Sequence, residues 1–542
     1  MKIEDNQKNK RKNINKKIMG REIQNMIHLG VSYIGFIFLL MLFIPNAFWM
    51  KNKPKDYDTY VKNENKILVC LERIGEVLVC CIALIFSDFN LRPLNIWSVW
   101  LGLAVLAMIG YEYNWVQYFK SEKNMTDFYS SFLGIPVAGA SLPVAAFGFL
   151  GIYGCNIFML IAVLILGIGH IGIHLGHRKE VYTLKKKNLP IRILRGILVL
   201  LLALVFFVIA VTIGAKNYHW IKDCVKSANG IEEEGYIELG GQEQYYVIRG
   251  EDVSNPVIIW IHGGPANPDT METFYFSNYL KENYTVIAWN QRGCGRTYFK
   301  NKEKDPNNET ADFGQIQEDL DELVDYARER FGQDKVILVG HSFGTMVGSK
   351  YAIDHPDKVT NYIGVGQMGA LGSDAYAYQD ALEKAISLGD DTTELEHAFE
   401  RYQKDPTIEN MLAVRSFADR YHEVPMTRDY LLDAYTSPYM GVDDIRWYLL
   451  QLNLREFVQL NQSLFDYINE KDVYDYGTEF QMPVVFISGS CDWVTPVDCT
   501  REYYNSIEAP NKRMELIEGW GHMVPLENPE EFANVLMDMI VK

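Results

Sequence analysis

The stretch VILVGHSFGTMVGSKYAI, residues 336–353, decides how the second half of this chain folds. It starts as an apolar run, passes through a Gly-x-Ser-x-Gly pattern centred on Ser342, and ends with helical spacing. Gly340 and Gly344 would let the backbone pass close to its neighbours in a strained strand-to-helix turn that leaves the Ser342 hydroxyl exposed. The five-residue pattern alone is weak evidence, so the interpretation of Ser342 as a nucleophile depends on its surroundings.

Short apolar runs alternate with helical periods through the rest of residues 233–542. This alternation predicts an α/β fold with a mostly parallel sheet covered by helices on both faces. The Gly-Gly pair at 240–241 predicts a β-hairpin before that sheet. The expected strands are 235–239, 243–249, 256–261, 284–289, 335–340, 361–366, 483–488 and 513–518, and the expected helices are 270–282, 316–331, 343–354, 498–507 and 528–540.

The stretch from about 368 to 478 breaks this alternation, because it is helical, polar and aromatic throughout. It is predicted to be an insertion that caps the carboxyl ends of the strands, where parallel sheets bind their ligands. The α/β domain is therefore expected to span 222–542, with the cap inside it.

A serine needs a base, and the base needs an acid to orient it. Asp492 directly follows the predicted strand 483–488, and His522 follows the predicted strand 513–518. The order Ser, Asp, His and the position of each residue at a strand end predict that Ser342, Asp492 and His522 form a catalytic triad.

The segment WIHGGPA, residues 260–266, closes an earlier predicted strand with a glycine pair. Such a pair lets a backbone N–H approach a substrate carbonyl. The predicted oxyanion hole consists of the N–H groups of Gly264, favoured over Gly263, and Phe343, the residue after the nucleophile.

Taken together, these motifs resemble the α/β-hydrolase fold, and within it the prolyl aminopeptidase (proline iminopeptidase) family of serine peptidases. The narrower resemblance rests on HGGPA, residues 262–266, followed by WNQRGCGRTYF, residues 289–299. It covers roughly residues 233–542 and implies the same triad, a helical cap, and release of an N-terminal residue, often proline, from peptides. The loops implied to line the substrate site contain Gly263, Pro265, Gln291, Arg292, Gly293 and Cys294.

The sequence departs from this family in three places. Asn290 stands where the family usually has an aspartate, and the nucleophile turn reads GHSFG rather than Gly-Gly-Ser-Trp-Gly. The family binds the substrate amine through cap carboxylates, and no motif identifies them here. Acids of the cap include Asp374, Asp380, Glu383, Glu394, Glu396 and Glu400, which also fit a solvated helical face.

The charge of the chain is divided between its two halves. Residues 1–220 carry 25 Lys+Arg against 13 Asp+Glu, whereas residues 221–542 carry 27 against 56. These opposite charges are expected if the basic, apolar half lies beside anionic lipid and the acidic half lies in water. The acidic half argues against a nucleic-acid partner, because it offers little positive charge for phosphates.

Residues 31–216 contain apolar runs long enough to cross a bilayer as helices, which requires about 20 residues. These runs predict an all-α transmembrane domain of five or six helices, and hence a multi-pass integral membrane protein. The run at 67–87 contains Glu72, Arg73 and Glu76, so it is either an amphipathic helix or a span with a buried ion pair. The clear runs are 31–49, 96–119, 131–176 as two spans with a hinge near 151–154, and 193–215.

The orientation follows from the basic segments. The tail 1–30 and the loop 177–192 are both basic and therefore expected in the cytoplasm, which agrees with five spans and conflicts with six. The α/β domain is then expected outside the cytoplasm. The apolar run 31–49 follows a long polar segment and lacks a small-residue cleavage site, so it is predicted to be a membrane anchor rather than a signal peptide.

His170, His174 and His177 recur at near-helical spacing beside a predicted membrane boundary. No further ligand can be placed near them from the sequence, so a polar helix end is favoured over a metal or haem site. The eight cysteines form no CxxC pair or zinc-type cluster. Cys294 is read as a small residue packed in a glycine-rich loop.

The preferred interpretation is a membrane-anchored serine aminopeptidase that acts on peptides through an acyl-enzyme. A carboxylesterase or lipase with the same triad, acting on small acyl substrates, is the first alternative. A non-catalytic membrane protein that binds a ligand is the second, and the ordered triad argues against it. The proposed chemistry requires no metal or organic cofactor.

Overall fold

The computed structural model describes residues 27–60, 64–92, 97–182, 189–421 and 430–540. The chain divides into two compact units, one over residues 22–222 and one over residues 223–542. Most of the basic tail 1–30 and part of the basic loop 177–192 lie outside the described residues.

The second unit is built on an eight-stranded sheet in the order β1-β2-β4-β3-β5-β6-β7-β8. The antiparallel pairs are β1 with β2 and β2 with β4, whereas the remaining neighbours are parallel. The predicted hairpin and the mostly parallel sheet are therefore confirmed. The strands are β1 (Ile231–Leu239), β2 (Gln242–Gly250), β3 (Val257–Ile261), β4 (Thr285–Trp289), β5 (Val336–His341), β6 (Val359–Val365), β7 (Val484–Gly489) and β8 (Lys512–Ile517).

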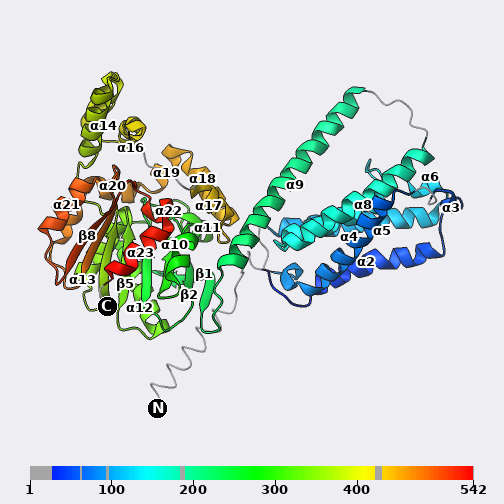
Figure 1. Cartoon of the computed structure of the whole chain (residues 1–542), viewed down its shortest axis with the longest axis horizontal. Helices are drawn as coiled ribbons and strands as arrows, with labels where there is room; N and C mark the ends of the chain where they lie inside the picture. Colours follow the sequence, from blue (N-terminus) through cyan, green and yellow to red (C-terminus); the bar gives the residue numbers. More distant parts are fainter. Residues whose placement is uncertain (1–26, 61–63, 93–96, 183–188, 422–429, 541–542) are drawn as a thin grey trace, which may run out of the picture. The chain divides into compact units, whose positions relative to one another are not determined.

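Helices cover both faces of this sheet (Figure 1). Alternate residues of β3 show the two faces: Ile259 packs into one core with α12 and α13, and Ile258 packs into another with α10 and α23. A strand buried on both sides reads as a continuous apolar run, which is why VIIWI lacks polar alternation. The helices of this layer are α10 (Thr273–Leu280), α11 (Gly295–Asn301), α12 (Phe313–Phe331), α13 (Phe343–Asp354), α21 (Val497–Ser506), α22 (Val524–Glu527) and α23 (Pro529–Met539).

The segment between β6 and β7 is helical and forms two small cores of its own. One core joins α14, α15 and α16 around Leu395 and Ala398, and in Figure 1 α14 and α16 extend beyond the end of the sheet. The other core packs Trp447, Phe457 and Phe465 onto the loops that follow β3 and β4. The elements are α14 (Asp374–Leu388), α15 (Thr393–Lys404), α16 (Ile408–Ala418), η3 (Asp419–Tyr421), α17 (Tyr430–Thr436), α18 (Val442–Gln451), α19 (Leu454–Leu460), α20 (Gln462–Glu470) and η4 (Val473–Tyr476).

The first unit is helical. Large apolar side chains point outward from its helices, among them Phe36, Leu106 and Leu164, each more than half exposed. Such a surface suits a lipid environment better than water. The elements are α2 (Tyr33–Met50), α3 (Tyr57–Tyr60), α4 (Lys66–Ile85), η2 (Ser87–Phe89), α5 (Ser98–Lys120), α6 (Met125–Phe128), α7 (Ala138–Tyr153), α8 (Ile157–Val181) and α9 (Leu189–Asp223).

Three described helices, α2, α5 and α8, are long and apolar enough to cross a membrane. The apolar helix α7 has 16 residues, fewer than the approximately 20 that a span requires. Side chains 189–204 of α9 lie outside the description. The structure therefore supports three spans, and the count of five or six stays a prediction.

Candidate active site

Ser342 lies on a sharp turn between β5 and α13. Its backbone has φ 52° and ψ −123°, a left-handed conformation that is costly for a residue with a side chain. A Cβ at Gly344 would collide with the carbonyl oxygen of Ile261, and a Cβ at Gly340 would collide with that of Gly344. The two glycines of the pattern therefore permit a turn that other residues would block.

Asp492 and His522 are hydrogen-bonded to each other, with 2.9 Å between His522 Nδ1 and Asp492 Oδ2. Asp492 follows β7, is almost fully buried, and also accepts hydrogen bonds from the backbone N–H and the hydroxyl of Thr495 at 2.9 and 2.8 Å. Burial alone would raise the pKa of Asp492, but His522 and Thr495 outweigh it and hold that pKa below its ordinary value. The carboxylate is therefore ionised and fixes His522 as a donor at Nδ1.

The segments that carry Ser342 and His522 lie close together. The rings of His341 and His522 are 5.0 Å apart between centroids. The backbone N–H of Ser342 donates to Val365 O at 3.0 Å, which fastens the turn to the end of β6. Among the described residues Ser342 Oγ has no hydrogen-bond partner, and such contacts often tighten only when substrate binds.

The predicted oxyanion loop approaches this serine directly. A Cβ at Gly263 would lie 2.9 Å from Ser342 Cβ, so only glycine permits this approach. Gly264 has φ 125° and precedes Pro265 through a cis peptide bond. The loop thus reaches the turn of Ser342, while the role of Ser342 as nucleophile and of the Gly264 and Phe343 N–H groups as oxyanion donors stays a prediction.

His262 anchors that loop to the segment after β4. Its Nε2 accepts from the backbone N–H of Gln291 at 3.1 Å, so its Nδ1 donates to Gly263 O at 2.8 Å. Gln291 Nε2 donates to His262 O at 2.9 Å. Burial lowers the pKa of His262 to about 4, and the ring is therefore neutral near pH 7. Gln291 thus holds the loop in place through its own buried amide.

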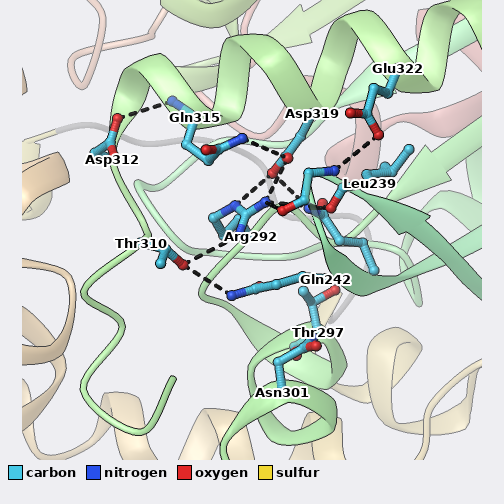
Figure 2. Close-up of polar contacts among 12 residues, drawn as sticks. Leu239, Gln242, Arg292, Thr297, Asn301, Thr310, Asp312, Gln315, Asp319 and Glu322 are labelled. Atoms are coloured by element: carbon cyan, nitrogen blue, oxygen red, sulfur yellow. Dashed lines mark hydrogen bonds and ion pairs between the residues drawn. The ribbon is translucent and has the colours of Figure 1, made fainter. Parts of the chain in front are cut away.

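Arg292 lies in a buried polar network (Figure 2). Its guanidinium donates to both carboxylate oxygens of Asp319 at 2.8 and 2.7 Å and to Gly240 O at 2.9 Å. Gln244 Nε2 also donates to Asp319 at 2.6 Å. The structure therefore gives Arg292 a bidentate ion pair that ties the loop after β4 to the hairpin and to α12.

Gly293 and Cys294 lie in the same loop. A φ of 78° at Gly293 and the nearby Ala311 side chain leave no room for a Cβ there. The Cys294 thiol is fully buried, 3.1 Å from Gln291 O, and burial raises its pKa. A buried neutral thiol is unreactive, as the interpretation of Cys294 as a packing residue requires.

Two of the cap acids singled out in the sequence have basic partners within the cap. Asp380 pairs with Lys384 at 2.9 Å, and both side chains are close to half exposed. Asp374 is buried but accepts from Arg415 Nε at 2.8 Å within the cap. Asp374 and Asp380 therefore form local ion pairs, and the structure assigns neither of them to a substrate amine.

Two buried acids of another segment were not identified from the sequence. Asp269 and Glu272 follow the oxyanion loop, and burial raises their pKa values to about 7 and about 8. The hydroxyl of Tyr448, from the cap, donates to Glu272 Oε1 at 2.8 Å. Asp269 Oδ1 and Glu272 Oε2 have no hydrogen-bond partner among the described residues. The available signal was two acids three positions apart shortly after HGGPA, and nothing in the pattern indicated that they are buried.

Comparison with known proteins agrees with this fold. The model of the alpha/beta hydrolase fold family matches residues 256–529, and the chain belongs to that family. It is 25% identical over 315 residues, 55% of this chain and 93% of the relative, to the probable aminopeptidase YbaC of Bacillus subtilis (strain 168). It is 24% identical over 310 residues, 57% of this chain and 92% of the relative, to a proline iminopeptidase of Saccharolobus solfataricus.

Among solved structures, proline iminopeptidase of Mycobacterium smegmatis is 18% identical, with a TM-score of 0.40, and covers 57% of this chain and 97% of its own. The match to the family model over residues 256–529 establishes the hydrolase fold of the second unit.

Proposed function

We propose that this chain is a membrane-anchored serine hydrolase of the aminopeptidase type, which releases N-terminal residues from peptides. The observation that carries the proposal is the His522–Asp492 hydrogen bond, at 2.9 Å, beside the strained turn of Ser342. A relative named as a probable aminopeptidase and another named as a proline iminopeptidase, aligned over 93% and 92% of their lengths, support the substrate class.

In the proposed reaction, Ser342 Oγ attacks the scissile carbonyl while His522 Nε2 takes its proton. Asp492 accepts from His522 Nδ1 and stabilises the imidazolium. The oxyanion is held by the N–H groups of Gly264 and Phe343. His522 then protonates the leaving amine, and a water activated by the same histidine releases the acyl group from Ser342.

The bilayer is the proposed partner of the first unit, which would anchor the hydrolase as a multi-pass protein. The apolar helices α2, α5 and α8 support this role, and the basic charge of residues 177–192 supports a hydrolase unit outside the cytoplasm. Protease added to sealed cells should cleave the hydrolase unit if this orientation is right. If the hydrolase unit were fully protected from the protease until the membrane was opened, the proposed orientation would be wrong.

The catalytic proposal is tested with the full chain in detergent. Free-amine prolyl and alanyl anilides, their N-blocked counterparts and short-chain esters are compared, with Ser342→Ala as the inactive variant and Ser349→Ala as control. Ser349 is buried on the same helix, α13, away from the turn. Cleavage of free-amine anilides alone, lost only in Ser342→Ala, is expected.

Cleavage of esters alone, again lost in Ser342→Ala, would retain the nucleophile but identify a carboxylesterase. Anilide cleavage that survives in Ser342→Ala would contradict the mechanism.

A further inference from the structure

The first unit holds a cluster of ionisable side chains that the hydrolase chemistry does not use. His170, His174 and His177 lie on α8 at spacings of four and three residues, so they share one face of that helix. Glu72 of α4 faces them, although it lies 98 residues from His170 in the chain. The fold therefore supplies the further ligand that could not be placed from the sequence.

The atoms of this cluster lie within coordination range of one another. His170 Nδ1 is 2.5 Å from Glu72 Oε1. Ligand atoms of Glu72, His170 and His174 all lie within 4.8 Å of one another, and the His170 and His174 rings are 4.6 Å apart between centroids. A metal with bonds of about 2.0–2.2 Å to nitrogen and oxygen needs little rearrangement to enter such a group.

Glycines bring the two helices close enough for this contact. A Cβ at Gly75 would lie 2.5 Å from Leu166 Cα, and a Cβ at Gly169 would collide with the backbone N of Glu72. Because both positions lack a side chain, α4 and α8 meet backbone to backbone. This close approach places Glu72 against the histidine face of α8.

A second layer of polar groups surrounds the cluster. The Tyr129 hydroxyl lies 3.0 Å from Nδ1 of His174 and 3.0 Å from Nδ1 of His177. His177 is almost fully buried, and its Nε2 lies 3.3 Å from Glu64 Oε1 without hydrogen-bond geometry. Metal-binding histidines usually have such a partner on the second ring nitrogen, which leaves Nε2 of His174 for the metal.

We propose that Glu72, His170 and His174 form a binding site for a divalent first-row transition metal, with zinc as the best fit. Two imidazoles and one carboxylate suit zinc and leave a fourth coordination position open. Ionisable groups within an apolar helical unit are costly unless they have a function, which a metal provides here. The bound ion would fasten α4 to α8.

The test measures zinc directly and does not depend on hydrolase activity. The full chain in detergent is stripped with a chelator, equilibrated with zinc, freed of unbound ion and assayed by mass spectrometry. Glu72→Gln keeps the shape of the side chain and removes the charged ligand, and His174→Ala removes a nitrogen ligand. His28→Ala is the matched control, because His28 Nδ1 contacts Asp88 Oδ1 at 2.8 Å in the same unit without belonging to the cluster.

We expect about one zinc per chain in the wild type and in His28→Ala. Glu72→Gln and His174→Ala should each lose most of it, while added zinc should raise the thermal midpoint of the wild type but not of Glu72→Gln. Equal zinc content in the wild type and both cluster variants would overturn the proposal, and the Glu72–His170 contact would then be only a part-buried polar contact between two helices.

Discussion

His341, the last residue of β5, is hydrogen-bonded to the backbone of the predicted catalytic base, His522. Its Nε2 donates to the carbonyl oxygen of His522 at 3.0 Å, and its ring stacks on Trp260 with 6.0 Å between centroids. Burial lowers the pKa of His341 to about 3, so the ring stays neutral and keeps one donor nitrogen. His341, which precedes Ser342 in the chain, thus positions the loop that carries His522.

Replacing His341 by alanine should lower kcat roughly 10- to 100-fold with a smaller change in KM, because a misplaced base costs rate more than binding. Steady-state kinetics on the preferred anilide measure both constants. His355→Ala, at the C-terminal end of α13, removes a ring contact with Tyr351 and a 3.9 Å contact with Asp321, and should leave both constants unchanged. An unchanged kcat in His341→Ala would show that His522 needs no support from this side.

Asp492→Asn should lower kcat roughly 10⁴-fold, because an amide cannot hold His522 in the tautomer that accepts the serine proton. The exposed Asp498 of α21, replaced by asparagine, is the control. Activity within a few-fold of the wild type in Asp492→Asn would remove this residue from the mechanism. Circular dichroism separates this loss from unfolding.

The buried acids Asp269 and Glu272 predict a pH-dependent stability. Their pKa values are raised to about 7 and about 8, so the folded chain keeps protons that the unfolded chain releases at lower pH. The free energy of unfolding should therefore fall as pH rises from about 4.5 to about 8. The fall is up to about 1.4 kcal/mol per pH unit for each acid that is protonated in the folded chain and ionised in the unfolded chain.

Glu272→Gln should flatten this fall, because it no longer has a proton to lose. The thermal midpoint of the hydrolase unit, measured by calorimetry across this pH range, checks the slope. Glu282→Gln, a change at an exposed acid just beyond α10, should keep the wild-type slope. A variant Glu272→Gln with the wild-type slope would place the titration elsewhere.

The Arg292–Asp319 pair should behave as a buried ion pair. Asp319→Ala leaves the guanidinium uncompensated and should cost about 3–5 kcal/mol of unfolding free energy. The double variant Arg292→Met, Asp319→Leu should cost less than Asp319→Ala, since no charge is then left buried. The exposed Arg501, replaced by alanine, should cost less than about 1 kcal/mol. Equal losses in the single and double variants would contradict a charge effect.

Much of the sheet could be predicted because strands such as β3, β4, β5 and β7 are buried on both faces. Short apolar runs such as VIIWI and VILVG, bounded by turn residues, favour a buried strand over a helix. The predicted strands coincide with β1–β8 within a few residues. The short helix Gly295–Asn301 was not predicted, because its seven residues follow a glycine-rich loop and show too little periodicity.

Contacts between distant segments could not be predicted. Glu72 meets His170 through glycines on two helices, and periodicity within one helix carries no information about the partner helix. The number of spans remained open for a related reason. Charged residues in α4 and the 16 residues of α7 make length and hydropathy insufficient to decide between a span and a helix buried against its neighbours.

Covalent labelling of Ser342 tests the central claim most directly. The full chain in detergent is treated with a fluorophosphonate, and the modified residue is located by mass spectrometry. The account predicts a single adduct on Ser342 that is absent from Ser342→Ala and forms much more slowly in His522→Ala. No adduct on a folded chain, or an adduct on another serine that persists in Ser342→Ala, would contradict it.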